Sequence, residues 1–341
     1  MRAARWWLSA RLAAVGALAA ACADAPTGAS QADVTAADLN LLHGLFCPDD
    51  TDHCRLPDRV ALFFDFVALR GCPDVVTLQE VWPPAVDLMR PRVATVCPFP
   101  YELVQGERLL NVDDETVLTR YPVVAKRQQF LYRGFRRVLQ VRIAHPEGTL
   151  DVYTTHLAAG SDGAQMPCAA DCPAECVAAG ASNVRECQAV QVARFVEDTH
   201  DVPGPALVAG DFNEPPGSFA YEQFVGRGWN DTYLAAGNPE CDPSTGVGCT
   251  SGRADEDLSG LESPALNQSE RIDFIFLVPP APGPSCAARI VVGDRGKPGE
   301  GPATRLFADV PNPFVDECGP LPLAICWPSD HIGTQVALAC D

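Results

Sequence analysis

Hydrophobic residues occur along most of this chain in short runs, each bounded by proline, glycine, aspartate or asparagine. Runs of this length that are rich in valine, leucine and isoleucine are typical of β-strands. We expect strands at residues 74–79, 116–124, 138–143, 150–157, 205–212, 271–278 and 333–340. Two segments, 59–69 and 184–200, instead carry apolar residues near helical spacing. The pattern therefore predicts a mixed domain of helices and many strands, without internal repeats.

The N-terminus follows a different pattern. Residues 1–21 begin with arginines, contain no acidic residue and carry an apolar stretch of about ten residues, which is too short for a transmembrane helix and typical of a signal peptide. The residues up to Cys22 resemble a bacterial lipoprotein signal, which would put a lipid anchor on Cys22 in a bacterial envelope membrane. Secretion without an anchor and an uncleaved anchor are the alternatives. We expect residues 22–33 to be a flexible tether and residues 34–341 to be a single folded domain.

Composition restricts the function of this domain. Hydrophobic residues make up 47% of the chain, which is enough for a sizeable core. The formal net charge is −19, and it becomes −22 once the three arginines of residues 1–21 are removed. Such an acidic surface argues against passive capture of nucleic acid or of anionic membrane. A phosphate site bridged by a metal ion remains compatible with it.

Cysteine is unusually frequent, with fifteen residues in the chain. Cleavage at Cys22 and its lipidation leave fourteen, an even number that predicts up to seven disulfides in an exported protein. Many of them lie in two segments that read as long loops, residues 158–183 and 279–328. The first loop has three cysteines at four-residue intervals, which could form a metal cluster, although export favours disulfides: Cys168, Cys172 and Cys176.

Polar residues with a shared chemistry stand at or near the ends of the predicted strands. Each has an ordinary explanation when taken alone, as a turn, cap or core residue. Together they offer four carboxylates, two imidazoles and two amides. Carboxylates suit Mg²⁺, or alternatively Mn²⁺, better than Zn²⁺, and amides and imidazoles suit phosphate oxygens. The residues are Asn40, Glu80, His156, Asp211, Asn213, Asp273, Asp330 and His331.

The order of these motifs along residues 38–341 strongly resembles the endonuclease/exonuclease/phosphatase superfamily, which includes deoxyribonuclease I, exonuclease III-type repair nucleases, inositol polyphosphate 5-phosphatases and neutral sphingomyelinases. The motifs are an asparagine in LNLLHG, then QE, TH, GDFN, RIDFIF and SDH. The resemblance implies an α+β fold, a four-layer α/β/β/α sandwich of two packed, mainly antiparallel sheets flanked by helices. It also implies a catalytic site at one edge of the sheets.

The resemblance implies a role for each matching residue. Glu80 would be the main metal ligand, with Asn40 beside it and Asp330 as a further metal-side carboxylate. Asn40, His156 and Asn213 would bind the substrate phosphate. With Mg²⁺ bound, this set would support hydrolysis of a phosphoric ester by in-line attack of water.

The remaining matches concern proton transfer. Asp211, with Asn213, would orient the attacking water, and His331, paired with Asp273, would help to activate it. Glu115 occupies a place similar to that of the carboxylate partner of His156 in the deoxyribonuclease I branch. No covalent enzyme intermediate is expected.

The substrate class is the least constrained part of the hypothesis. Where the deoxyribonuclease branch carries an arginine that meets DNA, this chain has Trp82, which favours a lipid or apolar leaving group. A basic segment with interleaved aromatic residues, 126–142, could contact nucleic acid or lipid headgroups, or be a hairpin with one basic face. We favour a phospholipid phosphodiesterase similar to sphingomyelinase or phospholipase C, acting as a monomer. A secreted deoxyribonuclease I-like nuclease, a soluble phosphomonoesterase and a non-catalytic surface binding module are the alternatives.

Overall fold

A computed structural model gives the structure of most of the predicted folded domain. It describes residues 33–43, 55–107, 114–133, 135–146, 148–164, 166–252, 268–279, 288–290, 303–306 and 328–340, and all of them belong to one compact unit that spans Ala32–Asp341. The predicted signal peptide and Cys22 lie outside the described residues. Of the helices in the described ranges, none is both long enough and apolar enough to cross a bilayer.

The larger sheet has the strand order β11-β13-β1-β2-β4-β3, and β12 also pairs with β13. Its strands pair antiparallel, except that β1 and β2 run parallel. The strands are β1 (Asp33–His43), β2 (Val75–Val81), β3 (Glu102–Gln105), β4 (Asp114–Thr119), β11 (Ala288–Ile290), β12 (Ala303–Leu306) and β13 (Gly333–Cys340).

The smaller sheet has the order β5-β6-β7-β8-β10-β9. It too is antiparallel apart from one central parallel pair, β7 with β8. The strands are β5 (Val123–Phe130), β6 (Arg137–His145), β7 (Gly148–His156), β8 (Ala206–Asp211), β9 (Asn230–Asp231) and β10 (Asp273–Val278).

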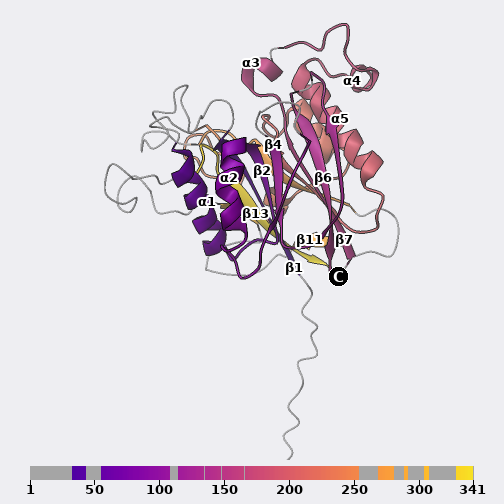
Figure 1. The fold of residues 1–341 in the computed structure, drawn as a ribbon. Helices are drawn as coiled ribbons and strands as arrows, with labels where there is room; N and C mark the ends of the chain where they lie inside the picture. The colour runs from indigo at the N-terminus through magenta and orange to yellow at the C-terminus, as the bar shows by residue number, and fades with distance from the viewer. Residues whose placement is uncertain are drawn as a thin grey trace, which may run out of the picture. The chain divides into compact units, whose positions relative to one another are not determined.

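Helices cover the outer faces of both sheets (Figure 1). Helices α1 and α2 share a core with the outward side chains of β1, β2 and β4, and α5 and α6 share a second core with β7, β8 and β10. A third apolar layer, built largely from valine, leucine and isoleucine, joins the inner faces of the two sheets. The helices are α1 (Leu56–Leu69), α2 (Pro83–Val93), α3 (Gly160–Gly163), α4 (Ala174–Ala179), α5 (Val184–Thr199), α6 (Phe219–Val225) and α7 (Thr232–Ala235).

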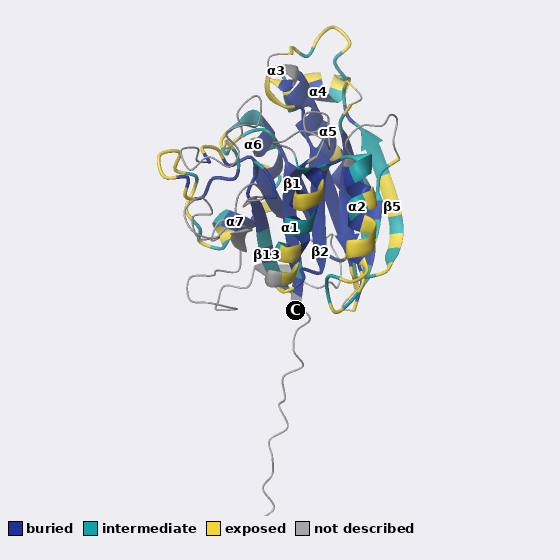
Figure 2. Cartoon of the chain, turned by 60° about the vertical axis from the view of Figure 1, so that its left-hand side comes forward, coloured by how far each residue is buried: buried dark blue, intermediate teal, exposed yellow. Residues whose placement is uncertain are grey.

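The predicted fold is therefore confirmed as a four-layer α/β/β/α sandwich. Figure 2 shows the same layers by burial, with dark blue strands in the centre and exposed residues on the outward sides of α1 and α2. The alternation of side chains along a strand explains this arrangement, because every second residue faces the other sheet and the residues between them face the helices.

Topology explains why polar residues distant in sequence meet at one edge. The carboxyl ends of a parallel pair point the same way, so β1 and β2 end together, as do β7 and β8, where His156 pairs with Asp211. Antiparallel neighbours begin at that edge, and β10 begins at Asp273 opposite Asp211. We refer to this edge, formed by the carboxyl ends of β1, β2, β7 and β8, as the site edge.

Three predicted segments differ from the observed elements. The apolar run 116–124, expected to be one strand, is two strands in different sheets: β4 ends at Thr119 and β5 begins at Val123. Pro122 stands between them, and proline cannot supply the N–H that a continuous strand would need. The predicted loop 158–183 contains two short helices, α3 and α4, and the predicted loop 279–328 contains the short strands β11 and β12.

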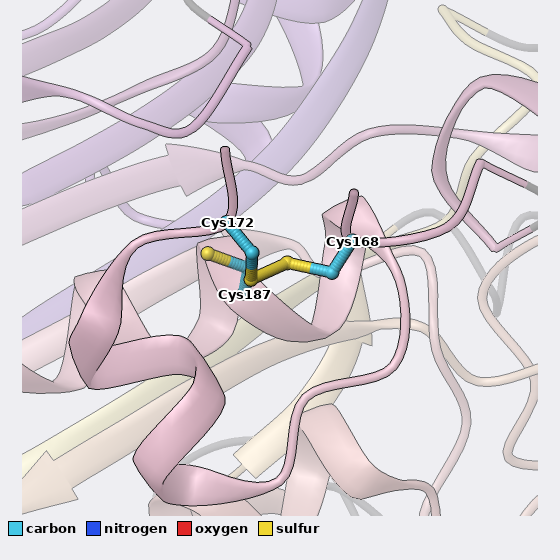
Figure 3. A group of neighbouring side chains, drawn as sticks. All are labelled: Cys168, Cys172 and Cys187. Carbon is cyan, nitrogen blue, oxygen red and sulfur yellow. A yellow bond between two sulfur atoms is a disulfide. The ribbon is translucent and has the colours of Figure 1, made fainter. Parts of the chain in front are cut away.

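Four disulfides lie within the described residues, and they account for eight of the fourteen cysteines that follow Cys22: Cys72–Cys97, Cys168–Cys172, Cys176–Cys187 and Cys241–Cys249. Figure 3 shows Cys187 next to the Cys168–Cys172 bridge, and the three sulfurs lie within 4.8 Å of one another. Cys168, Cys172 and Cys176, which are spaced four residues apart, thus form disulfides, as export favoured, rather than a metal cluster. The bridge to Cys187 fastens α4 to the first turns of α5.

Candidate active site

Unusual backbone geometry positions three residues at the site edge. Glu80 and Asn213 have positive φ angles of 57° and 54°, a conformation that costs energy in residues other than glycine and that clusters at functional sites. Gly210 has a φ of 148°, and a Cβ atom there would lie 1.9 Å from the carbonyl oxygen of Thr155. Glycine at position 210 therefore lets β8 approach β7 closely just before Asp211.

Asn40 joins the two sheets at the site edge. Its Nδ2 donates to Glu80 Oε1 and to Asp211 Oδ2, each at 3.0 Å, and its Oδ1 accepts from Leu42 N. The side chain of Glu80 is 24% exposed, whereas Asn40 and Asp211 are buried. Solvent thus reaches the site on the side of Glu80.

Asp330 approaches the same region from the last segment of the chain. Its carboxylate Oδ1 lies 3.2 Å from Ser329 Oγ, which donates to Asn40 O at 2.5 Å. Glu80 and Asp330 are the partly exposed carboxylates among the predicted site residues, and such oxygen donors suit a hard divalent cation. The donor set at Glu80, Asp330 and Asn40 therefore fits Mg²⁺ or Mn²⁺.

His331 and Asp273 form the predicted pair. The Nδ1 of His331 lies 2.9 and 3.1 Å from the two carboxylate oxygens of Asp273, and its Nε2 faces Asp211 Oδ2 at 3.8 Å. Burial lowers the pKa of His331, but Asp273, Asp330 and Asp211 outweigh it and raise that pKa well above its usual value. Asp211, Asp273 and His331 are all buried, and they form the compact acidic cluster of the site.

Asp211 occupies the centre of the site. Its Oδ1 accepts from the backbone N of Asn213 at 2.8 Å, while its Oδ2 accepts from Asn40. Burial and the nearby Asp273 raise the pKa of Asp211 to about 6, although His331 and the hydrogen bonds from Asn40 and Asn213 lower it. A buried carboxylate with this pKa suits a proton acceptor near neutral pH.

His156 faces Asp211 from β7, with its Nε2 3.4 Å from Asp211 Oδ2. Its Nδ1 lies 2.8 Å from Arg136 Nη1 and 3.9 Å from Glu80 Oε1. Burial, and after it the positive charge of Arg136, lowers the pKa of His156 well below its usual value. His156 is thus a neutral imidazole near neutral pH.

Glu115 has a different neighbour from the predicted one. It lies on β4, and its Oε2 pairs with Arg137 Nε at 3.1 Å. The hydrogen-bonding place at His156 Nδ1, where a paired carboxylate would stand, is taken by Arg136. An arginine from the loop before β6 is therefore the described partner of His156, which the sequence motifs did not indicate.

Helix α5 supplies further residues that the sequence analysis missed. Arg185, Gln188 and Gln191 are polar, yet all three are buried, because they share the inward stripe of the helix at three-residue spacing. Arg185 donates to the carbonyl oxygens of Ala158 and Asn213 and to Glu214 Oε1, the last at 2.8 Å. It thereby ties the loop after His156 to the loop after Asp211.

Thr250 holds the segments of the Asp273–His331 pair together. Its Oγ1 accepts from the backbone N of Ile272 and of Asp273 at 3.1 and 3.2 Å, and its carbonyl oxygen accepts from Ile332 N at 2.7 Å. Thr250 is buried and directly follows the Cys241–Cys249 disulfide. The side chain and the backbone carbonyl of Thr250 thus join the segments of Asp273 and His331, which are 58 residues apart in the sequence.

A buried polar cluster lies below the site, between the sheets. Asp38 Oδ1 accepts from Thr77 Oγ1 at 2.6 Å and from Gln79 Nε2 at 2.8 Å, and Gln79 Nε2 also lies 3.0 Å from Thr154 Oγ1 on the other sheet. Burial raises the pKa of Asp38 well above its usual value, although the hydrogen bond from Thr77 lowers it, and nearby Asp273 raises it further. The inner faces of the sheets therefore change from apolar to polar towards the site edge.

Taken together, the structure brings the predicted site residues to one edge of the sandwich, with Glu115 paired elsewhere. The arrangement offers partly exposed carboxylates for a cation, a buried carboxylate as a proton acceptor, and two imidazoles of different charge within 4 Å of that carboxylate. Such a set can hydrolyse an anionic ester, because it can neutralise charge and position water at the same place.

Comparison with known proteins agrees with this geometry. The endonuclease/exonuclease/phosphatase family matches residues 39–331 of the chain. No curated protein sequence matches the chain.

Solved structures resemble the whole fold at low sequence identity. TDP2 of D. rerio in complex with a single-strand DNA product is 18% identical, with 90% of this chain and 99% of that chain covered and a TM-score of 0.57. A mannosyl-6-phosphatase of Bacteroides thetaiotaomicron is 16% identical, with 90% and 99% covered and a TM-score of 0.55. The human Nocturnin catalytic domain with a bound sulfate anion is 14% identical, with 91% and 95% covered and a TM-score of 0.53. These likenesses establish the shared fold.

Proposed function

Because the chain belongs to the endonuclease/exonuclease/phosphatase family, whose members are hydrolases acting on phosphoester bonds, we propose that it is a Mg²⁺-dependent phosphodiesterase that works by in-line attack of water. The observation that carries the proposal is the meeting of the two parallel strand pairs at the site edge. There Asn40 donates hydrogen bonds to Glu80 in its own sheet and to Asp211 in the other sheet. His156 faces Asp211 within that second sheet.

Glu80 and Asp330, the partly exposed carboxylates of the site, would hold the ion, with the buried Asn40 beside Glu80. When bound, a divalent cation neutralises a non-bridging phosphoryl oxygen and the leaving oxygen of the substrate. Without substrate, the Glu80 carboxylate already accepts from Asn40 Nδ2 at 3.0 Å, and Asp330 Oδ1 lies 3.2 Å from Ser329 Oγ.

Asp211 is the proposed proton acceptor for the attacking water. Its Oδ2 is the point on which Asn40, His156 and His331 converge, at 3.0, 3.4 and 3.8 Å. The His331–Asp273 pair would orient the water. The N–H groups of His156 and Asn213 would stabilise the negative charge that develops on the phosphoryl oxygens. Asn213 Nδ2 donates one hydrogen to Leu157 O at 3.0 Å and carries a second.

A phospholipid is the substrate class that we propose. The basic segment 126–142, which could have been a nucleic-acid surface, has its charges largely paired within the protein: Arg127 with Asp201, Arg133 with Asp171, Arg137 with Glu115 and Arg142 with Asp151. Ion pairing of this kind weakens the electrostatic attraction on which binding to a nucleic-acid backbone depends. Phe135, at the end of the same hairpin, is 75% exposed and suits an apolar environment. The predicted lipid anchor on Cys22 would place the site near a membrane.

A secreted nuclease is the second candidate, and the D. rerio TDP2 complex with single-strand DNA supports it. That protein shares the fold at 18% identity, so the comparison supports a phosphodiester substrate more directly than DNA itself. A non-catalytic binding module is a weaker candidate, because the matching catalytic residues are present in this chain.

Two variants test the catalytic proposal. Glu80→Ala and His156→Ala should each lose most hydrolysis of bis-p-nitrophenyl phosphate in Mg²⁺, while keeping the circular dichroism spectrum of the wild type. Glu102→Ala removes an exposed carboxylate from β3 and serves as the control, with activity expected to stay unchanged. Wild-type activity in either site variant would refute the assignment.

The substrate is tested with the mature protein in Mg²⁺. Liposomes of sphingomyelin or phosphatidylcholine and supercoiled plasmid DNA are supplied in parallel, and release of phosphorylated headgroup or nicking is measured. Lipid cleavage without nicking is expected. Nicking without lipid cleavage would refute the phospholipid as substrate and would favour the nuclease function.

A further inference from the structure

The contact between Arg136 and His156 determines where the imidazole carries its hydrogen. Arg136 Nη1 lies 2.8 Å from His156 Nδ1. A guanidinium group can only donate hydrogen bonds and does not lose its proton in proteins. The Nδ1 atom must therefore accept, so the hydrogen of the His156 ring is on Nε2.

This hydrogen is directed at the centre of the site. His156 Nε2 lies 3.4 Å from Asp211 Oδ2, whereas Nδ1 is on the side of Glu80 Oε1. A phosphoryl oxygen bound beside Asp211 would thus meet an N–H donor rather than a lone pair. Donors aimed at the position where negative charge develops are among the strongest contributions to catalysis.

An acidic partner would have had the opposite effect. A carboxylate at Nδ1 accepts from the ring and leaves Nε2 without its hydrogen in the neutral form, as a hydrogen-bond acceptor. His331 has such a partner in Asp273, at 2.9 Å from its Nδ1. The two histidines of the site thus have partners of opposite polarity, one cationic and one anionic.

The loop that carries Arg136 is anchored to the loop that follows His156. Leu131 N donates to Arg136 O at 2.8 Å and closes the loop. Gln188 on α5 donates from Nε2 to Tyr132 O at 2.9 Å and accepts from Ala158 N at 2.8 Å. A single buried side chain therefore keeps a fixed distance between the two loops.

A second glutamine strengthens this anchor. Gln191 Oε1 accepts from Tyr132 N at 2.6 Å, so both backbone groups of Tyr132 are bound to α5. The Cys176–Cys187 disulfide fastens the first turns of the same helix. The contact between Arg136 and His156 is thus supported by a rigid element and not by the hairpin alone.

We propose that Arg136 is a positioning residue, which fixes the ring of His156 with its hydrogen on Nε2 so that this hydrogen meets a phosphoryl oxygen of the substrate. The inference rests on the proposed function for its catalytic consequence. The placement of the hydrogen is a property of the protein without substrate, and it can be measured separately.

The direct test uses metal-free protein labelled with ¹⁵N-histidine, in which two-dimensional NMR identifies the ring nitrogen that carries the hydrogen. Wild type and Arg136→Lys, which both present a donor, should show His156 with its hydrogen on Nε2. Arg136→Glu, which presents an acceptor, should move the hydrogen to Nδ1. Arg133→Glu, an exposed arginine three residues away that pairs with Asp171, is the matched control and should leave the His156 signals unchanged.

Kinetics with bis-p-nitrophenyl phosphate test the consequence. Arg136→Glu should lower kcat on the order of 100-fold, which is the lower end of what the loss of one donor to developing negative charge costs, and change KM much less. Arg136→Lys should recover most of kcat. The proposal is overturned if the hydrogen of His156 stays on Nε2 in Arg136→Glu, or if Arg136→Lys is as impaired as Arg136→Glu. If the wild type itself hydrolyses nothing, the proposed function fails, while the NMR result still decides the placement of the hydrogen.

Discussion

Replacing Arg185 by methionine should destabilise the protein and displace the loops that follow His156 and Asp211, two of the proposed catalytic residues. The guanidinium group is buried on α5 and donates to the carbonyl oxygens of Ala158 and Asn213 and to Glu214 Oε1. Methionine has a similar length and keeps the packing of the stem, but it offers no donor. The buried acceptors would lose their partners.

The size of the effect follows from these contacts. A buried acceptor left without a partner costs about 1–3 kcal/mol. Ala158 is buried, whereas the side chain of Glu214 is 17% exposed and can regain water. Removing the buried positive charge also removes its desolvation cost, which offsets part of this destabilisation. We therefore expect the free energy of unfolding to fall by about 2–4 kcal/mol. That is a large part of the roughly 5–15 kcal/mol by which a domain is stable.

Urea unfolding of the oxidised protein, followed by tryptophan fluorescence, measures this loss. With a slope of about 3 kcal/mol per molar urea, the midpoint should fall on the order of 1 M. Arg194→Met is the matched control, because Arg194 lies on the exposed face of the same helix and its replacement should leave the midpoint unchanged. Activity should fall about tenfold or more, since small displacements of catalytic groups are costly. Equal midpoints for the two variants would refute the reasoning.

Three further predictions concern other parts of the molecule. Thr250→Val should lower kcat with little change in KM, and Thr250→Ser, which keeps the hydroxyl, should restore it; equal loss in both variants would contradict the role of Thr250 Oγ1. The raised pKa of His331 means that its stabilising contribution is complete below the unfolded value of 6.5 and is lost as the pH rises through the folded value, so the melting temperature of metal-free protein should fall as the pH is raised above 6.5. Asp273→Asn removes a negative charge that raises the pKa of His331, so the melting temperature of this variant should depend less on pH. An equally steep fall in the variant would exclude His331 as the source of the pH dependence. Alkylation of unfolded but unreduced protein, followed by mass spectrometry, should leave the eight cysteines of the four described disulfides unmodified.

The sequence predicts the site well where position along a strand determines position in space. Asn40, Glu80, His156 and Asp211 stand at strand ends, and parallel pairing brings the ends of two strands together without further information. The motif order, through the family resemblance, indicates that these strand ends share one edge. The residues that meet there could therefore be named from the sequence, and their catalytic roles stay predictions.

Residues that act through tertiary contacts could not be predicted in this way. Arg185 and Gln188 look like the solvent-exposed side of a helix, because a buried polar residue is recognisable only once its acceptor, a loop carbonyl or amide far along the chain, is in place. Arg136 lies in a basic segment in which each arginine looks alike. The break at Pro122 was visible, but an apolar run on both sides of it concealed that the chain changes sheets there.

The contact of Asn40 with Asp211 has one more consequence, because it would place the proposed reaction at the boundary between the two sheets. Asn40 and Glu80 belong to the sheet of β1 and β2, whereas His156 and Asp211 belong to the sheet of β7 and β8. Their separation is set by the apolar layer in the middle of the fold, and close-packed interiors have low compressibility and transmit strain over distance. Turnover would then respond to hydrostatic pressure and to small changes of side-chain volume in that layer. Selection for activity would act on buried valines such as Val152 and Val336 as well as on the carboxylates at the edge.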